Sequence, residues 1–227
     1  GLVDEAGLEG VECYGGLDLA TVSDFTAYAL LFPSVDQDGV RDGTFDAVWR
    51  IFAPEDNLPE MNKRTAGNAE VWVREGWLKL TPGNVTDYDV VKDALTRDGE
   101  RFVIRDVAYD RWNSSQMVND LVKAGMEMSP IGQGYASLSA PTKEIKRLLK
   151  GGSPERPVLR HGGNPVMRWM VDNLAVAMDA AENVKPDKAK SHEKIDGFSA
   201  LVNAMERAMR TEQPGKSKYE TEDLLVI

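Results

Sequence analysis

Residues 12–20 read Glu-Cys-Tyr-Gly-Gly-Leu-Asp-Leu-Ala, an apolar run that carries a single aspartate, Asp18, near its end. A short, mostly apolar run of this kind predicts a buried strand. A carboxylate is costly to bury there unless another group pairs with it. The stretch therefore predicts a central strand whose aspartate is either functional or ion-paired with an arginine.

The neighbouring segments extend this strand into an antiparallel meander. Residues 21–24 have turn chemistry and lead into a second apolar run over residues 25–33. Residues 36–43 hold the Asp, Gln and Gly of a hairpin loop. A third strand is predicted over residues 44–53, where large apolar side chains occupy alternate positions.

The rest of the chain alternates helical and extended patterns. Helices are predicted over residues 59–76, 88–96, 139–149, 164–181 and 193–210, with one more that begins at Asn113 or Ser114. Short strands are predicted over residues 77–80, 101–108 and 127–131, and a lysine-rich connection over 184–191. We expect an α/β fold with a mixed central sheet, the meander plus parallel strands, and helices on both faces. One domain should cover residues 1–210, followed by a flexible charged tail over 211–227.

Composition narrows the class of protein. The 227 residues carry a net charge of -10, which argues against a protein that coats nucleic acid but not against an enzyme that acts on it. No run approaches the roughly 20 apolar residues of a membrane span, and no leader is visible, so a cytoplasmic protein is expected. The lone Cys13 excludes an internal disulfide and is expected to be buried and inert.

Three aspartates occupy positions where chemistry is expected. Asp18 lies in the first strand, Asp110 follows the strand over 101–108, and Asp196 begins the last helix. If the two strands are neighbours, about 4.8 Å apart, Asp18 and Asp110 can reach one metal ion. With Asp196 they form an oxygen-rich site that suits Mg²⁺ or Mn²⁺. Two such ions, roughly 4 Å apart, can activate water and stabilise the leaving oxygen of a phosphodiester.

Spacing alone leaves other interpretations open. Asp110 could be a turn residue before the next helix, and Asp196 could be a helix N-terminal charge that the dipole favours. Residues 141–170 are basic and could bind DNA, or could form a solvated helix face and a loop. The basic side chains of this segment are Lys143, Lys146, Arg147, Lys150, Arg156, Arg160 and Arg168.

Five blocks, in this order, resemble the nuclease half of the large terminase subunit of tailed phages. Each block is weakly specific alone, but together they run from about Cys13 to Arg210. They are Gly16-Leu17-Asp18-Leu19-Ala20 with Asp24, Ala108-Tyr109-Asp110-Arg111-Trp112, Gln133-Gly134-Tyr135-Ala136-Ser137-Leu138-Ser139, His161-Gly162-Gly163-Asn164-Pro165-Val166-Met167-Arg168-Trp169, and Glu193-Lys194-Ile195-Asp196-Gly197.

The resemblance implies an RNase H-like fold and a metal-binding cluster of Asp18, Asp110 and Asp196. Asp24 matches an auxiliary acidic residue, although it could equally cap a loop. With two Mg²⁺ or Mn²⁺ ions, such an enzyme would cleave double-stranded concatemeric DNA during genome packaging in the host cytoplasm. Its implied partners are the small terminase subunit and the portal protein, and the isolated domain is expected to be a monomer.

One departure from the whole terminase subunit is clear. The only Gly-Lys-Ser, at residues 215–217, lacks the earlier glycine of a phosphate-binding loop, because position 210 is Arg. We therefore expect no ATP binding by this chain. Two other functions stay open: a resolvase- or transposase-like nuclease on the same fold, and a docking module of the packaging motor without catalysis.

Overall fold

A computed structural model describes residues 1–19, 25–111 and 115–210. Its core is a seven-stranded sheet in the order β4-β3-β2-β1-β5-β6, with β7 paired to β3. The strands are β1 (Glu12–Asp18), β2 (Thr26–Val35), β3 (Arg41–Pro54), β4 (Lys79–Thr81), β5 (Val103–Asp110), β6 (Met128–Ile131) and β7 (Leu159–Arg160).

The pairing pattern confirms the predicted mixed sheet. Strands β1, β2 and β3 form an antiparallel meander. Strand β5 runs parallel to β1, and β6 runs parallel to β5, so the chain must cross over the sheet to reach them. The neighbouring position of β1 and β5 satisfies the condition under which Asp18 and Asp110 were expected to share a site.

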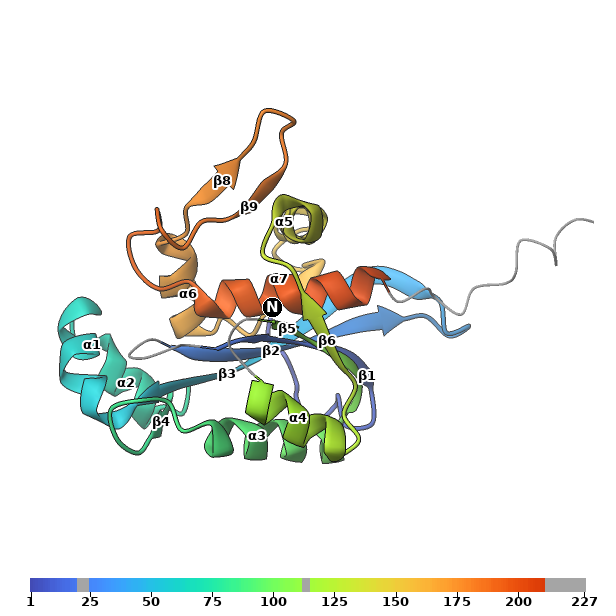
Figure 1. Cartoon of the computed structure of the whole chain (residues 1–227). Helices are drawn as coiled ribbons and strands as arrows, with labels where there is room; N and C mark the ends of the chain where they lie inside the picture. The colour runs from blue at the N-terminus through green and yellow to red at the C-terminus, as the bar shows by residue number, and fades with distance from the viewer. Residues whose placement is uncertain (20–24, 112–114, 211–227) are drawn as a thin grey trace, which may run out of the picture.

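Helices cover both faces of the sheet (Figure 1). Helix α7 (Asp196–Arg210) lies along one face, and α5 (Tyr135–Lys150) and α6 (Pro165–Asp172) pack around it. Helices α3 (Tyr88–Arg101) and α4 (Ser115–Lys123) cover the other face, so the sheet has an apolar core on each side. Two short helices, α1 (Leu58–Arg64) and α2 (Asn68–Arg74), follow a 3₁₀ turn, η1 (Glu55–Asn57), after β3. None of the described helices combines the length and apolarity needed to cross a bilayer.

The single helix predicted over residues 59–76 is wrong. The helix is interrupted between α1 and α2, where Ala66 and Gly67 adopt φ values of 51° and 88°. The Thr65 hydroxyl accepts a hydrogen bond from the Ala69 N–H at 2.9 Å and starts the second helix. A left-handed residue reverses the chain without interrupting the apolar pattern, so periodicity could not detect the break.

The helix predicted over residues 164–181 is also wrong beyond Asp172. Strands β8 (Val176–Met178) and β9 (Val184–Pro186) form a hairpin that projects from the body (Figure 1). The Asp179 carboxylate closes its turn by accepting from the N–H groups of Ala181 and Asn183. Val176 and Met178 stay exposed, so their apolar character does not mark a core-facing helix.

Several local predictions are confirmed. Cys13 is fully buried, and burial raises the pKa of its thiol. Asn164 caps α6 by accepting from the N–H groups of Val166 and Met167. Trp169 packs against the rings of Phe25 and Trp72, as expected for a core residue. One helix end was predicted wrongly: α3 runs through Gly99 to Arg101, five residues farther than its predicted end at residue 96.

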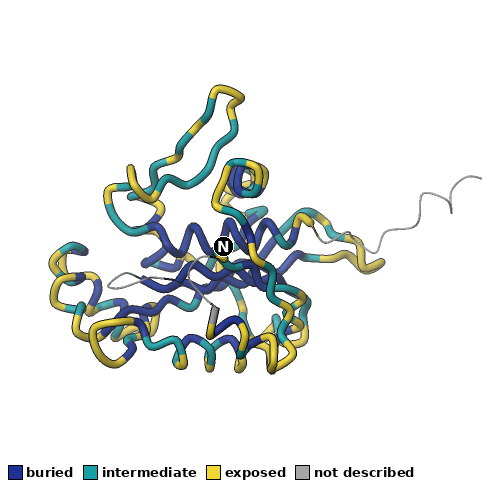
Figure 2. The backbone as a smooth tube through the Cα atoms, viewed as in Figure 1, coloured by how far each residue is buried: buried dark blue, intermediate teal, exposed yellow. Residues whose placement is uncertain are grey.

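Helix α7 approaches β1 very closely. A Cβ atom on Gly16 would overlap the Ala200 carbonyl oxygen and the Ala204 nitrogen, and would lie 2.9 Å from the Asn203 Cβ. Asn203 donates a hydrogen bond of 2.7 Å to the Leu17 carbonyl oxygen and ties the helix to the strand. Figure 2 shows α7 buried between the sheet and α5.

We therefore expect Gly16→Ala to lower the free energy of unfolding by at least about 2 kcal/mol, because the obstructing atoms belong to the backbone and cannot rotate away. Thermal or urea unfolding would measure the loss. Gly99→Ala is the matched control. Its Cβ would lie 3.7 Å from the nearest atom, and a helical Gly→Ala change should stabilise by about 0.5–1 kcal/mol. Equal stability of the two variants would contradict the close packing of α7 on β1.

Candidate active site

The carboxyl ends of β1 and β5 place two aspartates side by side. Gly16 pairs with Ala108 in the parallel register, and Asp18 and Asp110 each follow two residues later. Since side chains alternate along a strand, both aspartates lie on the face of Gly16, which is the face that α7 covers. Both line a cavity of about 640 Å³.

The third predicted aspartate reaches the same region from α7. Asp196 is the first residue of this helix, and its side chain is only 6 % exposed. The backbone of the next residue, Gly197, makes two buried contacts. The Trp49 indole N–H donates to the Gly197 carbonyl at 3.1 Å, and the Gly197 N–H contacts the Met170 sulfur at 3.2 Å.

A lysine links two of these carboxylates. Lys188 Nζ lies 2.5 Å from Asp18 Oδ2 and 2.9 Å from Asp196 Oδ1. The Ser199 side chain, one turn into α7, lines the same cavity as Asp18. Residues from β1, from the segment after β9 and from α7 therefore meet at one point.

Burial dominates the electrostatics of this cluster. It raises the pKa of the Asp18 carboxyl to about 7, and the negative charge of Asp196 adds to the rise, against the lowering effect of Lys188. Burial alone would lower the pKa of the Lys188 ammonium, but the two carboxylates outweigh it and raise that pKa above its ordinary value. Two buried carboxylates share one ammonium, so the cluster is short of positive charge.

The structure brings the predicted acidic residues together only in part. Asp18 and Asp196 meet through Lys188, and Asp110 lines the same cavity as Asp18. As placed, no three His, Cys, Asp or Glu side chains among residues 1–19, 25–111 and 115–210 are close enough to hold a metal ion together. Asp24 lies outside the described residues.

The basic residues predicted to bind DNA divide into two groups. Lys143, Lys146, Arg147 and Lys150 are exposed on α5, and Arg147 pairs with Glu144 at 2.7 Å. The Arg160 guanidinium instead holds both carboxylate oxygens of Asp46 at 2.5 Å and donates to the Ser34 hydroxyl, so it fastens β7 to β3 and β2.

Three lysines of this cavity were not predicted from the sequence. Lys185, Lys188 and Lys190 belong to the segment that was interpreted only as a connection. Lys185 donates to the Gln133 carbonyl at 2.9 Å, and its ammonium lies 5.4 Å from the centre of the Tyr135 ring. Their signal in the sequence was a run of lysines just before Asp196 in a chain with a net charge of -10.

Comparison with known families decides the identity. A profile described as the terminase large subunit, endonuclease domain, matches residues 1–212. This chain therefore belongs to that family. The family likeness predicted from the sequence blocks is confirmed.

Two curated relatives of this terminase nuclease domain are longer proteins. The large terminase subunit of Enterobacteria phage HK97 is 35 % identical over 207 residues, covering 89 % of this chain and 39 % of the relative. Protein YmfN of Escherichia coli K12 is 28 % identical over 223 residues, covering 96 % of this chain and 46 % of the relative. The chain thus spans less than half the length of each.

Solved structures agree with this assignment. The crystal structure of the HK97 large terminase superposes with a TM-score of 0.74 at 28 % identity, covering 90 % of this chain and 43 % of that chain. The large terminase nuclease of thermophilic phage G20c gives a TM-score of 0.51 at 12 % identity, covering 86 % of this chain and 84 % of that chain. The latter likeness concerns the fold, which is RNase H-like as predicted.

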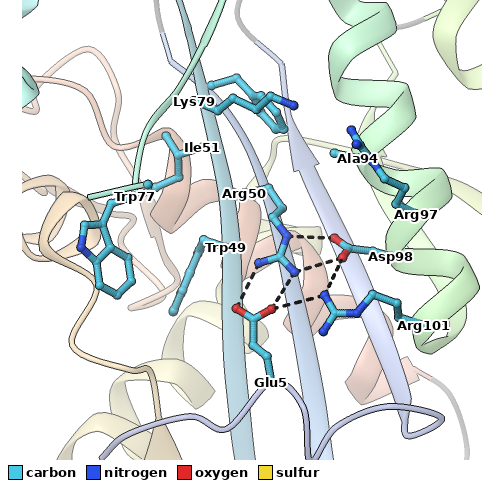
Figure 3. A pocket seen from close by; sticks show the side chains of 12 residues that line it. Glu5, Trp49, Arg50, Ile51, Trp77, Lys79, Ala94, Arg97, Asp98 and Arg101 are labelled. Atoms are coloured by element: carbon cyan, nitrogen blue, oxygen red, sulfur yellow. Dashed lines mark hydrogen bonds and ion pairs between the residues drawn. The ribbon is translucent and has the colours of Figure 1, made fainter. Parts of the chain in front are cut away.

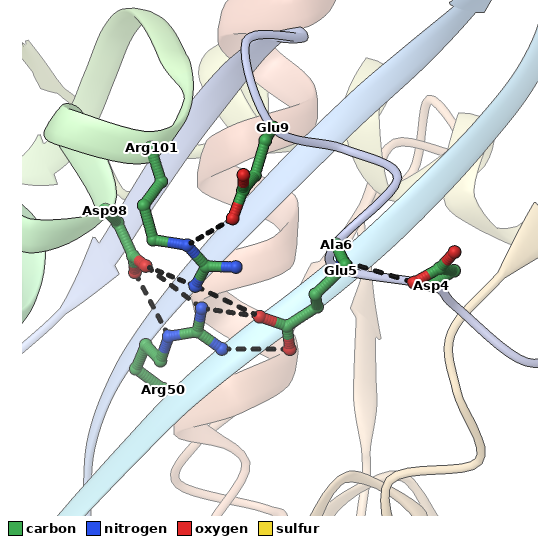
Figure 4. Close-up of polar contacts among 7 residues, drawn as sticks. All are labelled: Asp4, Glu5, Ala6, Glu9, Arg50, Asp98 and Arg101. Atoms are coloured by element: carbon green, nitrogen blue, oxygen red, sulfur yellow. Dashed lines mark hydrogen bonds and ion pairs between the residues drawn. The ribbon is translucent and has the colours of Figure 1, made fainter.

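A second polar cavity of the terminase domain lies on the α3 side of the sheet (Figure 3). It has a volume of about 420 Å³, and Arg50, Asp98 and Glu5 lie at its wall. The Arg50 guanidinium donates to both oxygens of Asp98, at 3.0 and 3.1 Å, and to both oxygens of Glu5, at 2.8 and 3.1 Å. Arg101 adds longer ion pairs to the same carboxylates (Figure 4).

These charged groups satisfy one another, so we interpret the cluster as a structural staple. It holds the N-terminal segment against β3 and α3. The side chain of Asp98 is 5 % exposed, and removing it would leave Arg50 with a single carboxylate partner.

We expect Asp98→Ala to lower the free energy of unfolding by about 2–3 kcal/mol, since it breaks a buried ion pair and leaves Arg50 with the Glu5 carboxylate alone. This expected loss in the free energy of unfolding is smaller than for a fully buried ion pair, because the Arg50 side chain is 23 % exposed. Urea unfolding would measure it. Glu9→Ala, which removes an exposed carboxylate 3.6 Å from Arg101, should cost less than about 0.5 kcal/mol. Similar losses in both variants would contradict the staple.

Proposed function

We propose that this domain is a metal-dependent endonuclease that cleaves double-stranded phage DNA during genome packaging. Asp18, Asp110 and Asp196 would hold Mg²⁺ or Mn²⁺, most simply two ions, and Asp24 would be an auxiliary ligand. The observation that carries the proposal is the convergence of two buried carboxylates on one cation, the Lys188 ammonium, in a cavity that Asp110 also lines.

The donor set fits a hard divalent cation. Carboxylate oxygens are the ligands that Mg²⁺ and Mn²⁺ prefer. The raised pKa of Asp18 reflects a buried carboxyl that lacks enough positive charge, and a bound cation would supply it. A magnesium-bound structure of the G20c nuclease, which shares this fold at 12 % identity, adds support.

The ions, when bound, would activate water and stabilise the leaving oxygen of the phosphodiester. The protein's own residues would position the carboxylates that hold the ions. The hydrogen bond from Asn203 to the Leu17 carbonyl oxygen holds the end of β1, and with it Asp18, against α7. Lys185 and Lys190, at the rim of the cavity, would attract the phosphates of the DNA. Among the described residues that line the cavity, Ser199 and Tyr135 carry hydroxyls, but no histidine is there to act as their base, so water is the expected nucleophile.

The wider role follows from the family. Since the chain spans 39 % of the HK97 subunit, the packaging ATPase is expected in another part of the longer protein. The proposed partners are double-stranded DNA, the small terminase subunit and the portal protein, in the host cytoplasm. Residues 1–210 would form the nuclease domain, and residues 211–227 would be a tail.

Cleavage of supercoiled plasmid tests the proposal. We expect Mg²⁺ or Mn²⁺ to convert the plasmid to nicked and linear forms, and EDTA to prevent this. Asp18→Asn and Asp196→Asn should each reduce the rate by about 10²–10³-fold, because each removes a negatively charged ligand of the ions that would stabilise the transition state while conserving the shape of the side chain. Gel analysis of the products over time measures the rate.

Asp89→Asn is the control, because Asp89 is an exposed residue in the first turn of α3 whose carboxylate pairs with Lys92 of the same helix. It should cut like the wild type. If the domain binds DNA but neither metal supports cleavage, the docking-module interpretation replaces the nuclease. If the Asp18 and Asp196 variants cut at the wild-type rate, the site is misplaced.

DNA binding should depend on the exposed lysines of α5. In an Asp18→Asn background, the combined change of Lys143, Lys146 and Lys150 to Gln should weaken binding most at low salt, and the difference from the parent should shrink as the salt concentration rises. The slope of the logarithm of the binding constant against the logarithm of the salt concentration is negative. Its magnitude should decrease by about 0.9 for each phosphate that the variant no longer neutralises. Fluorescence anisotropy with a labelled duplex measures both. Lys123→Gln, on α4 across the sheet, should change neither, and an unchanged slope in the triple variant would place the DNA elsewhere.

A further inference from the structure

We propose that Lys188 is a tethered counter-ion that occupies the space between Asp18 and Asp196 in the metal-free domain and competes with the first metal ion for it. The lysine would thus set the metal concentration at which the site loads. This inference rests on the proposed function, since it concerns the same carboxylates.

The contacts support occupation of the metal position itself. A single ammonium lies within 2.9 Å of an oxygen from each carboxylate, at 2.5 Å from Asp18 and 2.9 Å from Asp196. A divalent ion that bridged the same two oxygens would need the same space. The ammonium and the ion cannot both be there, because they would overlap and repel one another.

The charges explain why the Lys188 ammonium lies between the two carboxylates. The side chains of Asp18 and Asp196 are 11 % and 6 % exposed, so two like charges lie close together out of water. A buried carboxylate pair needs a compensating positive charge. Lys188 provides one charge for two carboxylates, which leaves a deficit that a divalent ion would remove.

The lysine can also leave without unfolding the domain. Its own side chain is 52 % exposed, although its ammonium touches both carboxylates. It lies in the segment between β9 and α7 and lines the 640 Å³ cavity, which offers the displaced ammonium solvent-accessible space. Displaced from the carboxylates, the ammonium would stay in the cavity beside the expected DNA phosphate.

Metal binding to the DNA-free domain tests the inference. We would titrate Mn²⁺ into the wild type, Lys188→Met, Lys123→Met and Asp196→Asn by isothermal calorimetry. If the Lys188 ammonium lies between Asp18 and Asp196 in about nine-tenths of the molecules, its removal should lower the apparent Kd for Mn²⁺ about tenfold. Lys123→Met removes one exposed charge on α4 and should leave the Kd unchanged. Asp196→Asn should weaken or abolish binding.

Thermal unfolding provides a second readout that a merely structural lysine would not produce. In EDTA, Lys188→Met should have a lower Tm than the wild type, because two buried carboxylates lose their counter-ion. In saturating Mn²⁺ the difference should vanish or reverse, since the metal replaces the missing charge and binds the variant more tightly.

The outcomes separate the inference from the proposed function. A tighter Kd and a Tm difference that closes with Mn²⁺ support the tethered counter-ion. Equal or weaker Mn²⁺ binding by Lys188→Met overturns it, while metal binding by the wild type that Asp196→Asn abolishes leaves the nuclease proposal intact. If neither the wild type nor Lys188→Met binds Mn²⁺, both the inference and the proposed metal site fail.

Discussion

The direct packing of α7 on β1 is the contact on which the rest of the structure depends. Gly16 makes it possible, because any Cβ there would overlap the backbone of Ala200 and Ala204. The Asn203 amide then fastens the helix to the Leu17 carbonyl. Helix and strand therefore pack directly on one another, with the first turn of the helix beside the end of the strand. That arrangement sets the distance between two acidic side chains that are far apart in the sequence.

A site of this kind must tolerate concentrated negative charge. The fold places Asp18 and Asp196 out of water and gives them one shared ammonium, from Lys188. Burial makes the carboxylates costly, and the same burial makes any cation that reaches them strongly held. The same buried negative charge that destabilises the fold would therefore favour binding of the metal ions that the family implies. The overall charge of -10 is compatible with DNA binding because exposed lysines gather on α5 and around the cavity.

Local patterns predicted much of the fold. Apolar runs, and alternating apolar residues in the third strand, predicted the three-stranded meander, and residues 101–108 were predicted as a strand that the structure pairs with β1. The errors fall where local pattern and tertiary role disagree. Ala66 and Gly67 turn the chain in the left-handed region between two helical segments, and Val176 and Met178 alternate in a hairpin whose apolar side chains stay exposed. Periodicity indicates which residues share one face of a helix or strand, but it does not indicate whether that face packs against a core.

The sequence by itself determined the chemistry available to this protein. It supplied aspartates at a strand end and at a helix start, an ordered set of family blocks, and a sheet built on the run over residues 12–20. Only the tertiary structure decided which groups meet. The approach of Asp18, Lys188 and Asp196 depends on how α7 crosses the sheet and on where the β8–β9 hairpin returns the chain. The contact between Asp18 and Lys188 joins residues 170 positions apart, and local propensity carries no information about pairing over that separation.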